Sequence, residues 1–419
     1  DDGVQTSVLR LSDAAGFARR DSWVPGEEHS VPAIEAKLLA TQVEPDAVSS
    51  DVLDIVERCW QAGALTEADV TRLFNVRGAD FSYVVAQADQ LREKVNGDTV
   101  SYVVNRNINY TNVCYFKCQF CAFSKGKQSE NLRGRPYDIT GEDIAGRCSE
   151  AWDRGATEVC MQGGIHPDYT GQTYLDIVNT VRSATPEMHI HAFSPLEVWQ
   201  GAATLGISVP AFLRQLRQAG LNTLPGTAAE ILHDEVRANL CPDKLNTEQW
   251  LEVMAASHAE GLRTTATIMY GHIDRPRHWA SHLLHIRSLQ QRTGGFTEFV
   301  PLPFVHMEAP MYLKGKARRG PSFREAILMH AVARLVFHGL IENIQASWVK
   351  MGREGVAACL KAGVNDLGGS LMNESITRAA GSGHGQEWAP ELMEAQIHAA
   401  GRQPRMRTTL YGDAAQERR

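Results

Sequence analysis

The chain has 419 residues, of which 43% are hydrophobic and 22% are charged, and its formal net charge is −7. This composition is typical of a globular protein, and the length allows one large domain with an appendage, or two domains. The sequence contains no basic stripe and no long apolar run, so we expect neither nucleic acid nor a membrane as a partner. The first residues do not resemble a signal peptide, and we expect a cytoplasmic protein.

An irregular arm is expected at the N-terminus. Residues 1–31 mix charges with proline and glycine and leave little apolar surface to pack. We therefore assign residues 1–60 to a linker or N-terminal arm, in which a helical pattern begins near residue 31.

A helical segment follows this arm, over residues 61–98. Thr66 and Asp69 stand three residues apart, as in a capping box, and predict the start of a helix. A second helix is predicted over residues 81–95, because the pair Asn96-Gly97 is typical of a helix stop.

From residue 99 onward, short apolar strands alternate with helical segments. The strands are predicted at residues 100–105, 158–162, 189–193, 222–224, 264–270, 298–302, 344–348 and 365–367. The helices between them are predicted at residues 141–154, 173–184, 209–219, 247–260, 277–292, 322–338 and 352–362. Such alternation predicts an α/β fold with a parallel sheet, and eight repeats over roughly 270 residues fit a (β/α)8 barrel of the TIM type.

We place this barrel at residues 99–380, with the N-terminal helices as one extension and residues 381–419 as a C-terminal extension. A doubly wound sheet is the alternative fold, because it contains the same alternation of strands and helices.

Three cysteines, Cys114, Cys118 and Cys121, follow the first predicted strand in C-x3-C-x2-C spacing. A cubane iron–sulfur cluster has four irons and normally takes four cysteines, so three thiolates leave one iron open. No further cysteine or histidine pair follows at the spacing of a structural zinc site. The motif therefore predicts a cluster with an open position, and we assign these cysteines as metal-binding and catalytic residues; three ordinary buried thiols are the alternative.

The other cysteines stand singly in apolar surroundings and are expected to be core residues. They are Cys59, Cys148, Cys160, Cys241 and Cys359.

Polar or glycine-containing runs follow most of the other predicted strands. They are residues 162–167, 191–195, 225–230, 269–274, 303–306, 345–348 and 365–369. In a barrel, the active site lies at the carboxyl ends of the strands, so we expect these runs to surround the cysteine motif. Each run alone is an ordinary loop, but their recurrence after so many strands favours a shared pocket.

The cysteine spacing, with the aromatic residue Phe120 before the last cysteine, resembles that of the radical S-adenosylmethionine (SAM) enzymes. Further runs resemble the CofH-type half of FO synthase, the 5-amino-6-(D-ribitylamino)uracil–L-tyrosine 4-hydroxyphenyl transferase. They are residues 105–112, 161–167, 189–195 and 269–272. Residues 1–60 resemble the linker of fused FO synthases, so we expect the chain to be the C-terminal half of a bifunctional enzyme.

This resemblance implies that the three cysteines hold a 4Fe–4S cluster whose open iron chelates the amine and carboxylate of SAM. It places Phe120 beside the adenine, and it places Gln162, Gly163 and Gly164 in the turn whose backbone meets the methionyl amine. Glycine in this turn is expected to leave room for the ligand. Glu230 is the candidate for the ribose of SAM or for the amine of tyrosine.

The resemblance also implies the reaction. A 5′-deoxyadenosyl radical takes hydrogen from the amine side of L-tyrosine, and the Cα–Cβ bond of tyrosine then breaks. The hydroxybenzyl fragment joins C5 of 5-amino-6-(D-ribitylamino)uracil, and the rest of tyrosine leaves as 2-iminoacetate. A flavodoxin- or ferredoxin-type electron donor and a CofG-type partner half are implied as partners. The candidate substrate-binding residues at the strand ends are His191, Ser194, Tyr270, His272, Trp348 and Asp366.

Two other functions are alternatives. A sister radical SAM enzyme of menaquinone biosynthesis, of the aminofutalosine synthase type, has the same cysteine motif and a different substrate. A non-catalytic iron–sulfur electron carrier also holds a cluster, but a carrier has no need of polar residues after so many strands and forms no 5′-deoxyadenosine from SAM.

Overall fold

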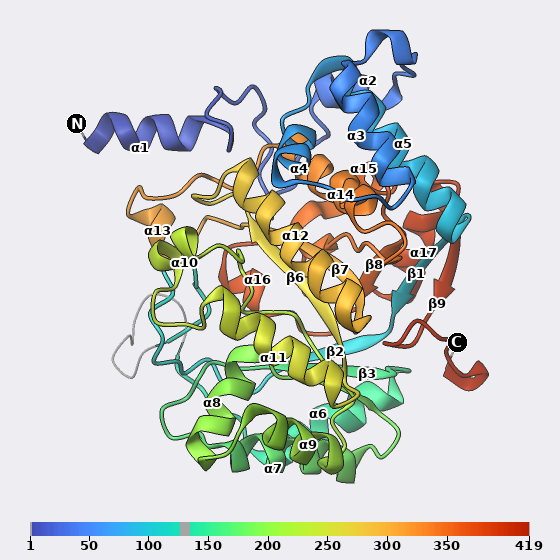
Figure 1. Ribbon diagram of the computed structural model, residues 1–419. Helices are drawn as coiled ribbons and strands as arrows, with labels where there is room; N and C mark the ends of the chain where they lie inside the picture. The colour runs from blue at the N-terminus through green and yellow to red at the C-terminus, as the bar shows by residue number, and fades with distance from the viewer. Residues whose placement is uncertain (1, 126–134, 419) are drawn as a thin grey trace.

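In the computed structural model, which describes residues 2–125 and 135–418, six parallel strands form the main sheet in the order β2-β3-β4-β5-β6-β7 (Figure 1). They are β2 (Asn105–Asn109), β3 (Glu158–Gln162), β4 (His189–Ala192), β5 (Thr223–Leu224), β6 (Arg263–Tyr270) and β7 (Phe296–Pro303). A doubly wound sheet reverses its strand order at a switch point, so the alternative fold is wrong.

Backbone pairing continues the sheet beyond β7 and back toward its first strand. A smaller sheet contains β8 (Asp366–Gly369), β1 (Thr99–Val103) and β9 (Gln403–Met406). Ile344 pairs with β7, and Gln345 pairs with β8. The Asn107 N–H in β2 donates to the Leu371 carbonyl, which follows β8. The strands therefore surround a common axis, and the prediction of a (β/α)8-type barrel is confirmed.

Two predicted strands differ from the observed ones. The strand predicted at residues 100–105 is divided at Val104 between β1, which pairs with β8 and β9, and β2, which pairs with β3. The cysteine motif consequently follows β2. The strand predicted at residues 344–348 is reduced to isolated pairs, because helix α15 already begins at Trp348.

The helices of the barrel lie around its sheet or beyond the carboxyl ends of its strands (Figure 1). They are α6 (Gly141–Asp153), α7 (Gly171–Ala184), α8 (Pro195–Leu205), α9 (Val209–Ala219), α10 (Asp234–Leu240), α11 (Thr247–Ala259), α12 (Pro276–Thr293), α13 (Pro310–Leu313), α14 (Phe323–Val336), α15 (Trp348–Cys359) and α16 (Ile376–Ala379). Every helix that the sequence predicts between the strands is present, whereas no pattern predicts α8 or α10.

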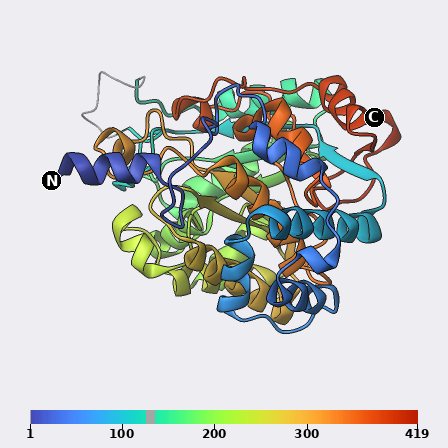
Figure 2. The same cartoon turned by 90° about the horizontal axis from the view of Figure 1, so that it is seen from above.

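Helices α2 to α5 cover one side of the barrel (Figure 2). They are α2 (Ala33–Ala40), α3 (Ser50–Trp60), α4 (Glu67–Phe74) and α5 (Gly78–Asn96). Because α3, α4 and α5 pack against α14, every residue of α14 is buried, although the outer helices of a barrel normally keep a polar face. The capping box at Thr66 and Asp69 is confirmed, and Gly97 ends α5 with φ of 59°.

The N-terminal arm is more ordered than its sequence predicts. Helix α1 (Asp2–Leu11) forms where we expected irregular chain. The Trp23 ring packs edge-on against Phe323 with 5.3 Å between centroids, and the buried Gly26 donates its N–H to the Lys350 carbonyl at 2.8 Å. The expectation that this arm has little to pack is wrong, because its partners lie hundreds of residues away along the chain.

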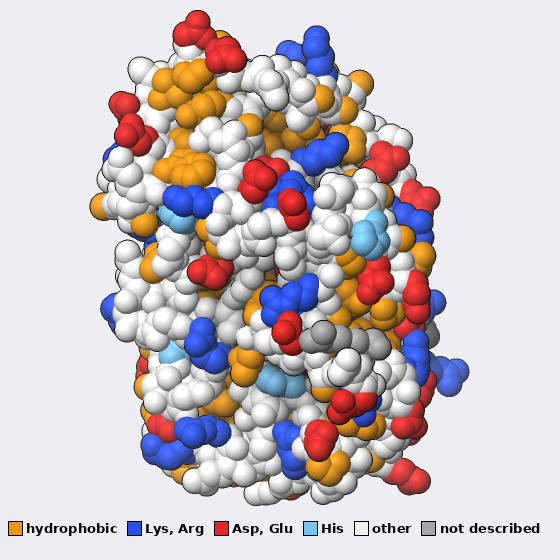
Figure 3. Space-filling view, turned by 90° about the vertical axis from the view of Figure 1, so that its right-hand side faces the viewer, with side chains coloured by type: hydrophobic (Ala, Val, Ile, Leu, Met, Phe, Trp, Pro, Cys, Tyr) orange, Lys and Arg blue, Asp and Glu red, His pale blue; other side chains and the backbone are white. Residues whose placement is uncertain are grey.

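The C-terminal extension adds α17 (Pro390–Ala399), β9 and a short 3-10 helix (Gln416–Arg418), and residues 407–411 enter the base of the barrel. On the face shown in Figure 3, acidic and basic side chains are interspersed. None of the helices that the structure describes is long and apolar enough to cross a bilayer.

Candidate active site

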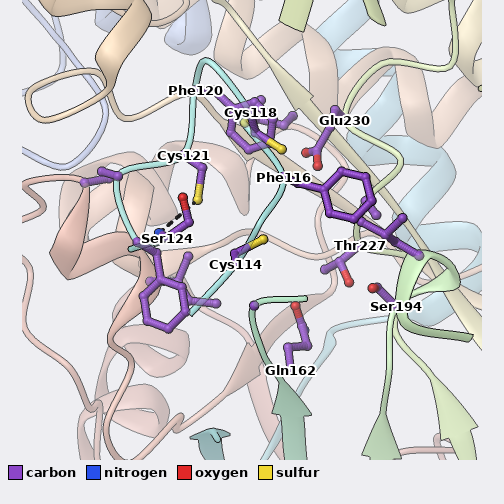
Figure 4. A pocket seen from close by; sticks show the side chains of 18 of the residues that line it. Cys114, Phe116, Cys118, Phe120, Cys121, Ser124, Gln162, Ser194, Thr227 and Glu230 are labelled. Atoms are coloured by element: carbon purple, nitrogen blue, oxygen red, sulfur yellow. Dashed lines mark hydrogen bonds between the residues drawn. The ribbon is translucent and has the colours of Figure 1, made fainter. Parts of the chain in front are cut away.

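A cavity of about 250 Å³ lies at the carboxyl ends of the barrel strands. Its walls come from the loops after β2, β3, β4 and β5, from the ends of β6 and β7, and from α15 and α16. The predicted site residues that line this cavity are Cys114, Cys118, Cys121, Phe120, Gln162, Gly163, Gly164, Ser194 and Glu230 (Figure 4). The structure therefore brings together the whole predicted cluster and cofactor set.

The cysteine loop is held in place by its backbone. Its two ends meet, because the Lys125 N–H donates to the Asn112 carbonyl at 2.8 Å and the Cys114 N–H donates to the Lys125 carbonyl at 3.2 Å. Farther along, the Gln119 N–H donates to the Leu240 carbonyl at 2.9 Å. These bonds fix where the cysteine side chains point.

The three thiols of this loop face the same space (Figure 4). None of the cysteines in the described chain forms a disulfide, and burial raises the pKa of the Cys114 and Cys118 thiols. The Cys121 Sγ accepts a hydrogen bond from the Ser124 N–H at 3.3 Å, a contact that also tunes cluster thiolates. Convergent thiols from one anchored loop fit a 4Fe–4S cluster with one iron left for another ligand.

The two glycines after β3 allow the turn to lie directly beneath the cysteine loop. A Cβ on Gly163 would lie 2.3 Å from the Tyr110 ring, and a Cβ on Gly164 would lie 2.3 Å from the Val113 carbonyl oxygen. We expected these glycines to leave room for a ligand. Their nearest neighbours are instead protein atoms, so the close approach that requires glycine is the one between turn and loop.

Glu197 supports this turn from below and is absent from the predicted site. Its buried carboxylate accepts the Ser194 N–H and hydroxyl, each at 2.6 Å, the Gly163 N–H at 3.2 Å, and the Tyr110 hydroxyl. Burial raises the pKa of Glu197. Ser194 thus lines the cavity but donates its hydroxyl to the capping box of α8. The S-x-x-E spacing of that box is the signal that identifies Glu197.

Lys244 interacts with both Glu230 and Phe120. The Glu230 carboxylate pairs with Lys244 at 2.8 Å, and Lys244 Nζ lies 5.5 Å from the centre of the Phe120 ring. Glu230 also has φ of 45°, an uncommon conformation for a non-glycine residue and one that is found at functional sites. The end of β5 is therefore tied to the cysteine loop through Lys244, which follows α10 in a connection without a recognisable pattern.

Five of the predicted substrate-binding residues are not among the described residues that line this cavity. They are His191, Tyr270, His272, Trp348 and Asp366. Trp348 donates its indole N–H to the Gly369 carbonyl at 2.9 Å and stacks on Trp388, and Tyr270 is fully buried against Trp279. Both rings form part of the barrel wall.

The polar members of that set are bonded to protein groups. His272 Nδ1 accepts the next backbone N–H at 2.8 Å, and His191 Nδ1 lies 2.7 Å from the Thr223 hydroxyl. The Asp366 carboxylate binds Arg407 at the opposite end of the barrel. A substrate role for these residues stays a prediction that the geometry does not favour.

The lining also includes a lysine that the sequence pattern misses. Lys350 lies in the first turn of α15, two residues beyond the strand predicted at 344–348. A break at Gly352, with φ of 66°, separates this turn from the rest of α15, and Lys350 stands on the turn, at the mouth of the barrel. A prediction of a helical turn that begins at Trp348 would have identified Lys350.

Two family models match the chain. The model of the radical SAM superfamily matches residues 108–285, and the model of the CofH/MqnC C-terminal region matches residues 293–418. Among solved structures, methylornithine synthase (PylB) superposes with a TM-score of 0.65 at 17% identity, covering 84% of this chain and 97% of that one. The hydrogenase maturase HydG from Carboxydothermus hydrogenoformans has a TM-score of 0.64 at 13% identity, covering 86% and 80%. These likenesses confirm the predicted fold.

Relatives with higher identity include the FO synthase of Streptomyces avermitilis, 49% identical over 89% of this chain and 43% of that protein. The chain thus spans less than half the length of the FO synthases it matches. The 5-amino-6-(D-ribitylamino)uracil–L-tyrosine 4-hydroxyphenyl transferase of Methanopyrus kandleri is 47% identical over 88% of this chain and 97% of that protein. The chain therefore belongs to the family of these 4-hydroxyphenyl transferases, within the radical SAM superfamily.

Proposed function

We propose that this chain cleaves L-tyrosine and transfers its 4-hydroxybenzyl fragment to 5-amino-6-(D-ribitylamino)uracil, a step of FO biosynthesis. The observation that carries the proposal is the match with the Methanopyrus kandleri transferase along nearly its full length. The position of the cysteine loop, at a cavity to which the carboxyl ends of β2 to β7 contribute, supports it.

In this proposal, Cys114, Cys118 and Cys121 would hold the 4Fe–4S cluster, and the Gly163-Gly164 turn would offer its backbone to the methionyl end of SAM. When bound, the cluster and SAM supply a one-electron cleavage that yields a hydrogen-abstracting radical. Phe120 and Glu230 line the same wall and remain the candidates for the adenosyl part of SAM.

The chain itself supplies positioning and exclusion of water. The cavity walls include Phe116, Leu196, Met269 and Phe304, which leave little polar surface around the reacting groups. A radical attacks nearby C–H bonds indiscriminately, so a dry and tightly shaped cavity favours reaction with the intended substrate alone.

The partners follow from the length of the relatives. Because the chain spans 43% of the FO synthase from Streptomyces avermitilis, we assign the ring-closing step to a CofG-type half, in the same polypeptide or a separate one. A flavodoxin- or ferredoxin-type donor would reduce the cluster, and a cytoplasmic setting would keep the thiols reduced.

A sister enzyme of menaquinone biosynthesis is the second candidate. The description of the C-terminal family model names MqnC beside CofH, so that match alone does not single out the CofH function. The identity to a full-length tyrosine transferase favours the first.

The test is an anaerobic reaction of the reconstituted protein with SAM, a reductant, tyrosine and the ribitylaminouracil. Mass spectrometry should detect an adduct that has gained a hydroxybenzyl group, together with 5′-deoxyadenosine and without finished deazaflavin. Addition of a CofG-type half should then give the fluorescent deazaflavin. An adduct that forms from a chorismate-derived enol ether without tyrosine would assign the chain to the menaquinone branch, and absence of 5′-deoxyadenosine would favour an electron carrier.

A further inference from the structure

Among the described residues of the cavity wall, every charged side chain except one has a protein partner. Glu197 accepts four hydrogen bonds from protein groups, and Glu230 pairs with Lys244 at 2.8 Å. Lys350 lines the same cavity. Its ammonium makes neither a hydrogen bond nor an ion pair with any residue that the structure describes.

The backbone of Lys350 and the nearest carboxylate are both held by hydrogen bonds, so neither is free to move and form an ion pair. Its carbonyl accepts the Gly26 N–H at 2.8 Å, which ties the first turn of α15 to the N-terminal arm. The nearby acid, Glu374, uses its carboxylate oxygens on the N–H groups of Thr377 at 2.7 Å and Arg378 at 3.2 Å. Glu374 therefore caps α16 and makes no ion pair with the lysine.

Burial lowers the pKa of Lys350 to about 8, although Glu374 and Glu230 oppose the shift. The ammonium is thus still charged at neutral pH but poorly solvated. Val305, Ile376 and Ala380 also line the cavity, and apolar walls strengthen the attraction between a cation and an incoming anion. A ligand with a negative group would relieve this unpaired charge.

We propose that Lys350 binds the α-carboxylate of the amino-acid substrate, tyrosine, and thereby selects an amino acid over an amine. This inference rests on the proposed function. Of the molecules in that reaction, the ribitylaminouracil has no carboxylate, so the choice lies between tyrosine and the methionyl end of SAM.

The position of Lys350 in the barrel favours tyrosine. With β2 counted as the first strand position, the Gly163-Gly164 turn follows the second position, whereas Lys350 follows the seventh, formed by Ile344 and Gln345. The methionyl end of SAM is proposed to lie at the glycine turn. Lys350 therefore faces the cavity from another side, where the substrate would approach.

The test measures binding of labelled tyrosine and of tyramine, which lacks only the carboxylate. Equilibrium dialysis uses the protein with its cluster and SAM but without reductant, so no ligand is consumed. In Lys350→Met, the Kd for tyrosine should rise about tenfold to a hundredfold, which is the usual worth of a hydrogen bond to a charged group. The Kd values for tyramine and for SAM should stay within about twofold.

Three further variants separate binding from folding. Lys350→Gln should repeat the effect with a polar side chain, Lys350→Arg should retain most of the affinity for tyrosine, and Lys361→Met, an exposed lysine just after α15, should change nothing. Iron content and melting temperature verify that each variant is folded. A structural role for Lys350 would weaken tyrosine and tyramine alike and would overturn the inference.

The remaining outcomes are equally decisive. Weaker SAM binding in Lys350→Met would assign the lysine to the SAM carboxylate and overturn the inference. Unchanged tyrosine binding, where the unsubstituted protein does bind tyrosine, would contradict this inference alone. If the unsubstituted protein binds no tyrosine at all, both the inference and the proposed function are wrong.

Discussion

At the base of the barrel, where the strands begin, buried carboxylates meet the C-terminal tail. Arg407 binds Asp366 of β8 at 2.5 Å and Glu298 of β7 at 3.3 Å. The Thr409 hydroxyl donates to Glu158 of β3 at 2.6 Å, and the Tyr411 hydroxyl donates to Glu298. Every one of these carboxylates is thus held by a protein donor.

At the mouth of the same barrel, the pattern is different. Cys118 lines the cavity without a hydrogen bond to its sulfur from any described residue, and the Lys350 ammonium likewise has no hydrogen-bond or ion-pair partner among the described residues. Buried polar groups normally have protein partners, and the exceptions need an explanation. The comparison teaches that polarity alone does not mark a site. Polar groups with protein partners at the base stabilise the fold, whereas polar groups without such partners at the mouth are candidates to bind ligands.

The largest effect is expected when a mouth thiol is removed. Cys118→Ala should lose the cluster and all formation of 5′-deoxyadenosine, because two thiolates in this loop cannot hold four irons. Iron analysis and an anaerobic cleavage assay measure both. The matched control is Cys148→Ala, a buried thiol on α6, which should retain its iron. Full activity in Cys118→Ala would contradict the cluster assignment.

The second largest effect, a loss of stability, is expected at the base of the barrel. Arg407→Met removes the cation from between Asp366 and Glu298, and leaving buried carboxylates unpaired should cost about 3–5 kcal/mol in the free energy of unfolding. Urea denaturation measures this loss. The control is Arg405→Met, whose pair with Asp413 is solvent-exposed and should be worth less than about 1 kcal/mol. If Arg407→Met were as stable as its control, the base would not hold the fold.

The sequence predicts only part of this difference between the base and the mouth of the barrel. The cysteine spacing and the strand–helix alternation are local patterns, so they predict the cluster loop and the barrel. The sequence pattern places Asp366 at the mouth, because residues 365–369 resemble the end of a strand. In the structure it begins β8, and a shift of so few residues moves a side chain from one end of the barrel to the other. Its partner Arg407 lies too far along the chain for any local pattern.

A smaller effect is expected from the turn that supports the mouth. Gly164→Ala places a Cβ against the Val113 carbonyl, and such overpacking typically costs about 1–3 kcal/mol. The strain falls on the cysteine loop, so the variant should bind less iron and lose it faster to a chelator. Gly146→Ala is the control, since a Cβ there meets open space. Equal iron retention in the two variants would show that the loop does not depend on this contact.

The smallest effect concerns a carboxyl group at the base. Burial raises the pKa of Glu298 from 4.5 to about 7, against the opposing influence of Arg407 and with added repulsion from Asp366. Between these two values the folded protein binds a proton that the unfolded chain has released, so this group makes stability fall as pH rises from about 4.5 to 7. Glu298→Gln replaces a neutral acid by a neutral amide and should differ by less than about 1 kcal/mol at pH 5, close to the pKa of the unfolded carboxyl group.

Between pH 5 and pH 7 the two stability curves should separate, and at pH 8 the glutamine variant should be the more stable protein, because its side chain has no charge to bury. Urea denaturation from pH 5 to pH 8 gives the two curves, and Glu391→Gln, at an exposed position of α17, is the control that should follow the unsubstituted protein. Parallel curves for Glu298→Gln and the unsubstituted protein would mean that Glu298 is ionised throughout. Arg407 would then balance two negative charges at once, and the base would resemble the mouth in holding a charge that its protein partners do not fully satisfy.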